Sequence, residues 1–147
     1  MTYEDSLKTN LTTALGLPDG AVSWLLGLWQ FIQTFDDIVD GEEPSRADLD
    51  KMLWLALVDM PKNEFYRANA GWLIPVVSSA VLEWMASDYA ERNGRADARS
   101  YVWRAGFYRV VCTVASLVHG PSSQISEMAL GLYGETVDDY LKEFNHA

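Results

Sequence analysis

The chain has 147 residues, of which 49% are apolar and 22% are charged, and these values fit one soluble globular domain over residues 1–147. They exclude a disordered tail, a collagen-like fibre and a disulfide scaffold. With 21 acidic and 11 basic residues the net charge is -10, so the sequence predicts no direct nucleic-acid binding and favours cations or basic proteins as partners.

Capping residues, glycines and prolines divide the chain into about six helices, and no alternating run predicts a strand. Thr2, Asp19 and Asn63 stand where side chains cap helix starts, and Pro61 is expected to end the third helix. The predicted helices cover residues 3–15, 20–40, 45–60, 64–92, 95–118 and 122–144. The predicted fold class is therefore all-α, a compact helical bundle.

The interior of this bundle is predicted from three runs without a charged residue. The runs are residues 20–35, 68–82 and 110–126. They fall on the second, fourth and fifth helices, which are expected to form the buried centre. Pro75 predicts a kink in the fourth helix, and Gly131 with Gly134 predicts a joint in the last one. Each run is shorter than the ~20 apolar residues of a membrane span, so no span is expected.

With one cysteine and two histidines, the sequence does not favour a cysteine nucleophile or a zinc site. Cys112 lies in the apolar run Val-Val-Cys-Thr-Val, which is typical of a buried, unreactive thiol. His119 and His146 cannot form a zinc site by themselves, and no CxxC or HExxH spacing is present. A lone cysteine forms no internal disulfide, so we expect the protein in the reducing cytoplasm.

The most informative segment is FDDIVDGEE, residues 35–43, at the end of the second helix. Five acidic residues follow sixteen residues without a charge, at a helix C-terminus where the macrodipole is negative and basic residues are expected. Carboxylates three and four positions apart also repel one another along a helix. Such a local conflict is typical of a functional site, and the missing partner is a cation.

Helical geometry extends this segment into a polar stripe over about a third of the helix circumference. The stripe consists of Ser23, Gln30, Gln33, Asp37 and Asp40, with Asp36 on its flank. Amides that lead to carboxylates suit a cavity whose mouth holds Mg²⁺, because oxygen ligands favour that ion over zinc or copper. The alternative is the solvated face of an amphipathic helix with an acidic end.

The motif Asp36-Asp37-Ile38-Val39-Asp40 resembles the first aspartate-rich motif, DDxxD, of class I isoprenoid synthases, and FDDIVDGEE is especially similar to the squalene and phytoene synthase branch. The resemblance implies an α-helical fold in which Asp36 and Asp40 hold Mg²⁺ that bridges to a substrate diphosphate. Arg46 stands where prenyl diphosphate synthases carry one residue of an arginine pair. Because the chain has half the length of the family fold, the resemblance implies either a homodimer that completes the site or a reduced relative that binds without turnover.

The same family uses a second acidic helix across the cavity, for which Glu135, Asp139 and Glu143 are the candidates. These residues recur every four positions and share one helix face. Their spacing departs from the family's second motif, which is commonly DDxxD or DxxxD. The alternative is a solvated terminal helix that packs by its apolar side.

Basic residues cluster where the fourth and fifth helices meet. Arg95 and Arg99 are candidates for clamping a diphosphate, and the alternative is ion pairing with the acids nearby. Glu91, at the end of the fourth helix, is expected at the surface.

Two functions follow from these patterns. The first is Mg²⁺-dependent binding of a diphosphate-bearing ligand at Asp36, Asp37 and Asp40, with turnover as a prenyl diphosphate transferase or lyase left open. The second is a non-enzymatic role, in which a small acidic helical protein binds the basic surface of a partner, as a nucleic-acid mimic does.

Overall fold

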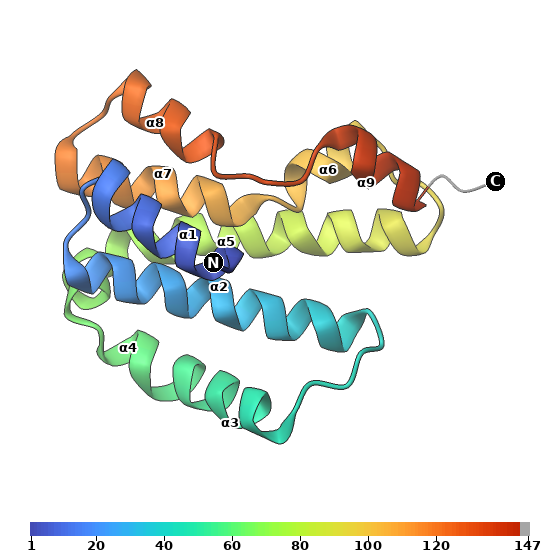
Figure 1. The fold of residues 1–147 in the computed structure, drawn as a ribbon, viewed down its shortest axis with the longest axis horizontal. Coiled ribbons are helices and arrows are strands. Elements are labelled where there is room, and N and C mark those ends of the chain that lie inside the picture. The colour runs from blue at the N-terminus through green and yellow to red at the C-terminus, as the bar shows by residue number, and fades with distance from the viewer. Residues whose placement is uncertain (145–147) are drawn as a thin grey trace. The chain divides into compact units, whose positions relative to one another are not determined.

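The computed structural model describes residues 1–144, and every regular element in that part of the chain is helical (Figure 1). The predicted all-α fold class is therefore confirmed. The chain divides into two compact units, Met1–Ala70 and Gly71–Ala147, while one domain over residues 1–147 stays a prediction. His146 lies outside the described residues.

The first unit begins with helix α1 (Tyr3–Thr9), which continues as the π-helical segment η1 (Asn10–Ala14). Thr2 caps α1 as predicted, since its side chain accepts a hydrogen bond from the backbone N–H of Asp5. Leu7 and Leu11 bury their side chains in the core. Gly16 ends the segment with a φ of 59°, in the left-handed region that glycine adopts without strain.

Helix α2 (Asp19–Val39) is buried along its first half only. Its buried residues run from Ala21 to Leu28, and no residue from 29 to 39 is buried. Gly27 permits the close approach of α2 to the segments after it, since a Cβ there would lie 3.3 Å from Leu55 Cδ2. Consequently the acidic end of α2 extends beyond the part of the helix that contributes to the core.

The next helical stretch consists of α3 (Arg46–Trp54), the π-helical segment η2 (Leu55–Asp59) and α4 (Met60–Lys62). The prediction that Pro61 ends this stretch was wrong by two residues, because helical structure continues to Lys62. Pro61 lies in α4, which continues η2 without a break, and because proline has no backbone N–H it donates no hydrogen bond to the preceding turn.

Helix α5 (Glu64–Arg92) starts in the first unit and continues in the second. Asn63 caps it as predicted, with Oδ1 2.9 Å from the backbone N of Tyr66. The backbone is non-helical at Asn69 rather than next to Pro75. The Asn69 side chain donates to the carbonyl of Phe65 over 2.9 Å, so that acceptor keeps a partner at the break.

Helix α5 differs most from the expectation of a buried centre, since only Leu73 and Ser87 are buried along it. Trp72 and Leu82 are 67% and 65% exposed. By length and composition, α5 is the one helix among the described residues that could cross a membrane. The predicted absence of a membrane span stays a prediction.

The second unit continues with four shorter helices. They are α6 (Ala98–Trp103), α7 (Gly106–His119), α8 (Ser123–Leu130) and α9 (Val137–Phe144). The predicted helix over residues 95–118 is thus two helices, because Arg104 and Ala105 interrupt it. The predicted joint in the last segment is confirmed, since residues 131–136 separate α8 from α9. Helix α7 packs on α8, and α6 packs on α9.

Candidate functional site

The acidic end of α2, which comprises Asp36, Asp37, Asp40, Glu42 and Glu43, lies at the surface of the first unit. Asp36 is partly exposed and the other four residues are exposed. The side chains of Asp37 and Asp40 form no hydrogen bond or ion pair with any residue that the structure describes. The structure therefore keeps the charge conflict that the sequence predicts at this helix end.

The other predicted ligand residues of the first unit have separate roles. Gln30 donates a hydrogen bond from Nε2 to Glu4 and so joins α2 to α1. Gln33 is exposed. Arg46 Nε lies 3.2 Å from Asp50 Oδ1 on its own helix, and both side chains are largely exposed. Gln30 and Arg46 thus each have a polar partner within the first unit.

Apolar side chains accompany the acidic ones at this helix end. Phe35, Ile38 and Val39 are each about two-fifths exposed, and Phe31 stacks on Phe35 with ring centroids 6.4 Å apart. The end of α2 is therefore a mixed surface of carboxylates and apolar groups.

Asp36 and Asp40 are the two carboxylates at this helix end that could hold Mg²⁺. Asp36 and Asp40 are one helical turn apart, and Mg²⁺ is commonly held by one or two carboxylates together with waters and substrate phosphates. Within residues 1–144, no group of three or more His, Cys, Asp or Glu side chains is arranged to hold a metal. A metal here would need phosphate or water for its remaining ligands.

The candidates for the second acidic helix lie in the second unit. Glu135 precedes α9 and is partly buried, whereas Asp139 and Glu143 are exposed on α9. Burial raises the pKa of Glu135, and the charges of Glu143, Glu91 and Asp139 raise it further while Arg104 lowers it. These carboxylates are thus close enough to influence one another.

The second unit contains a buried polar cluster that the sequence patterns did not predict. We call it the Glu91 cluster, and it consists of Ser87, Glu91, Ser100, Arg104 and Tyr140. Glu91 Oε2 lies 2.7 Å from the Tyr140 hydroxyl and 3.1 Å from Arg104 Nη1. The Tyr140 hydroxyl lies 2.6 Å from Ser100 Oγ. Only 12% of the Glu91 side chain and 23% of the Arg104 side chain are exposed.

Burial dominates the electrostatics of this cluster. It raises the pKa of Glu91, although the hydrogen bond from Tyr140 and the charge of Arg104 act in the opposite direction. It also raises the pKa of Tyr140 to about 12. Burial likewise raises the pKa of the neighbouring Tyr133, whose hydroxyl is buried without a hydrogen-bond partner among the described residues. The cluster holds α5, α6 and α9 together through buried polar contacts.

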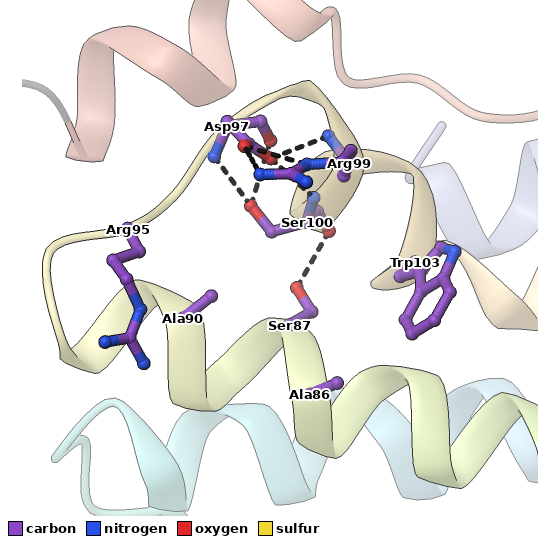
Figure 2. Close-up of a pocket in the computed structure, with 8 residues that line it drawn as sticks. All are labelled: Ala86, Ser87, Ala90, Arg95, Asp97, Arg99, Ser100 and Trp103. Atoms are coloured by element: carbon purple, nitrogen blue, oxygen red, sulfur yellow. Dashed lines mark hydrogen bonds and ion pairs between the residues drawn. The ribbon is translucent and has the colours of Figure 1, made fainter.

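Arg95 and Arg99 both line a pocket of about 420 Å³ in the second unit. Figure 2 shows Ala86, Ser87 and Ala90 of α5 along one side, with Trp103 and Arg95 towards opposite ends. Arg99 Nη2 lies 2.7 Å from Asp97 Oδ2, so the alternative of local ion pairing is confirmed for Arg99. Arg95 lies over the ring of Tyr89, with Cζ 5.6 Å from the ring centroid.

Neither a family model, nor a curated protein, nor a solved structure matches this chain. The resemblance of residues 35–43 to the isoprenoid synthases therefore stays a prediction.

Proposed function

We propose that the acidic end of α2 is a docking surface for a basic partner protein. The observation that carries this proposal is the exposure of Asp37 and Asp40 without a partner among the described residues. The C-terminus of an α-helix carries about half a negative charge from its macrodipole, which adds to the field of these carboxylates. A basic surface would neutralise both.

The neighbouring apolar groups support the same proposal. Phe35, Ile38 and Val39 offer contact area beside the carboxylates, and charge supplies orientation and a fast encounter. The openness of this region favours a macromolecule over a small ligand, because small ligands are commonly held in concave pockets that bury about 70–90% of their surface. No residue of α2 after Leu28 is buried.

Fluorescence anisotropy with labelled decalysine tests this proposal. We expect Asp37→Asn combined with Asp40→Asn to weaken binding about tenfold, because each exposed ion pair is worth about 0.2–1 kcal/mol. The matched control combines Glu127→Gln with Asp138→Asn, which removes the same charge from exposed positions on α8 and α9. Equal losses in the two double variants would show that only net charge matters and would contradict the proposal.

Binding of Mg²⁺ with a diphosphate at Asp36 and Asp40 is the second candidate. It is favoured by two carboxylates one turn apart at a helix end where Asp40 has no partner among the described residues. A thermal melt at fixed ionic strength distinguishes it from docking. A rise in Tm that requires Mg²⁺ and pyrophosphate together, and that Asp40→Asn abolishes, would favour this candidate.

A further inference from the structure

One side of α5 exposes a row of large apolar side chains in the second unit. We call it the α5 face. It consists of Trp72, Ile74, Val81, Leu82, Met85 and Tyr89, each at least half exposed. At ~100° per residue these positions fall within about half of the helix circumference. A soluble monomer rarely exposes an apolar patch above a few hundred Å².

Most of the α5 face, from Gly71 to Ser87, carries little charge. Between Gly71 and Ser87 the sequence contains one charged residue, Glu83. Glu83 forms an ion pair with Arg109 of α7, and only 14% of its side chain is exposed. The pair neutralises its charge, so this stretch presents apolar groups and small polar ones. Charged groups flank the face at Tyr89, where Arg92 and Arg95 lie over the ring.

We propose that the α5 face pairs with the same face of a second copy of this chain. An apolar side chain that is about half exposed presents on the order of 100 Å², so the six of them present roughly 600 Å², close to the ~800 Å² that each partner buries in a standard interface. Two chains of net charge -10 repel each other. The stretch from Gly71 to Ser87, whose one charge is paired, is therefore where a second copy meets least repulsion.

The residues of the α5 face also suit a two-fold axis. In an antiparallel pair of identical helices, positions at equal distances from the axis face each other. An axis between Val81 and Leu82 places Ile74 opposite Tyr89, and the small Ser78 opposite Met85. The Ser78 hydroxyl already donates to the carbonyl of Ile74 over 2.7 Å, so it needs no partner across the interface.

A second copy suits this face better than a lipid bilayer does. Insertion of α5 would carry the Glu83–Arg109 and Glu91–Arg104 ion pairs towards the hydrocarbon, where charged groups are costly. The start of α7 is also fixed to α5, because a Cβ on Gly106 would lie 2.7 Å from Ala80 Cβ. Thus α5 cannot leave the second unit without breaking these contacts.

Light scattering after size exclusion tests the proposal on the full chain. We expect the wild type to have twice the mass of one chain at micromolar concentration, and Leu82→Glu to have the mass of one chain. Leu53→Glu is the matched control, since Leu53 is 61% exposed on α3 in the first unit. A monomeric wild type, a dimeric Leu82→Glu, or a monomeric Leu53→Glu would each overturn the proposal. Circular dichroism checks that both variants remain helical.

Cross-linking tests the register independently. In a Cys112→Ser background, Leu82→Cys is expected to form a disulfide-linked dimer on mild oxidation, whereas Leu53→Cys is not. Equal cross-linking of the two variants would contradict the two-fold axis.

Co-sedimentation of a monomer with phosphatidylcholine vesicles would overturn the proposal in favour of lipid. The combined Asp37→Asn and Asp40→Asn variant should remain dimeric, so this proposal and docking at α2 fail separately.

Discussion

The Glu91 side chain is largely buried although the sequence predicts it at the surface, because an acidic side chain near a helix end is usually solvated. Glu91→Ala should destabilise the protein by about 3 kcal/mol, since it leaves Arg104 and the Tyr140 hydroxyl without their buried carboxylate. The free energy of unfolding in urea measures this loss. Asp50→Ala is the control, because Asp50 and its partner Arg46 are both largely exposed and the change should cost less than about 1 kcal/mol. Equal costs would contradict the burial argument.

Tyr133 and Tyr140 differ in how their buried hydroxyls are satisfied. Tyr140→Phe should cost about 1–3 kcal/mol, because it removes one buried hydrogen bond from Glu91 and one from Ser100. Tyr133→Phe should be neutral or stabilising, since it removes a buried hydroxyl with no partner within residues 1–144. Urea denaturation of the two variants compares them directly, and a larger loss for Tyr133→Phe would contradict this assignment.

Sequence reasoning located residues whose partners are near in the chain and missed those whose partners are distant. Thr2 and Asn63 each accept a hydrogen bond from the backbone N–H three residues further along the chain, so local spacing is enough to identify them as caps. Glu91 bonds to Arg104 and Tyr140, which follow it by 13 and 49 residues. Only the packing of α6 and α9 brings these groups together, and no local pattern predicts that packing.

At the scale of elements, the contact between α7 and α5 depends on one glycine. Gly106→Ala should destabilise the protein by about 1–3 kcal/mol, because the added methyl group would lie 2.7 Å from Ala80 Cβ. Gly71→Ala on α5 is the matched control. Nothing lies within 4 Å of its added Cβ, so the higher helix propensity of alanine should stabilise by about 0.5–1 kcal/mol. The two variants should therefore shift Tm in opposite directions, and a shift in the same direction would contradict the close packing.

Most helix ends could be predicted, but the buried side of α5 could not. Glycines and capping side chains act locally, so the start of α1, the end of η1, and the ends of α2 and α8 lie near their predicted positions. Helix α5 is apolar on most of its surface between Gly71 and Ser87, and periodicity cannot select a buried face on such a helix. The neighbours that pack on it decide which residues are covered.

For the whole molecule, the pKa directions predict higher stability in mild acid. The pKa values of Glu91 and Glu135 are raised above their usual 4.5, so the folded state binds more protons than the unfolded state between 4.5 and the raised values. Stability should therefore rise as the pH falls through the raised pKa values. Asp5 and Asp97 have lowered pKa values. Their contribution to the stability of the fold is therefore lost as the pH falls below their usual pKa of 3.8.

Thermal melts from pH about 7.5 down to about 4.5, the usual pKa of a glutamate, measure this dependence. Glu91→Gln should show a smaller gain in Tm on acidification than the wild type. Glu127→Gln removes the same charge from an exposed position on α8 and should keep the gain. A wild-type Tm that falls over this range, or equal gains in both variants, would contradict the prediction.

The most direct test of docking at α2 is a titration of the ¹⁵N-labelled protein with decalysine, followed by amide chemical shifts. Binding at the acidic end of α2 predicts that the largest shift changes fall on residues 35–43. These changes should decrease with added salt, because the carboxylates there are exposed. Shift changes that are equally large at the exposed acids of α9, or that spare residues 35–43, would contradict the proposal that this helix end receives a basic partner.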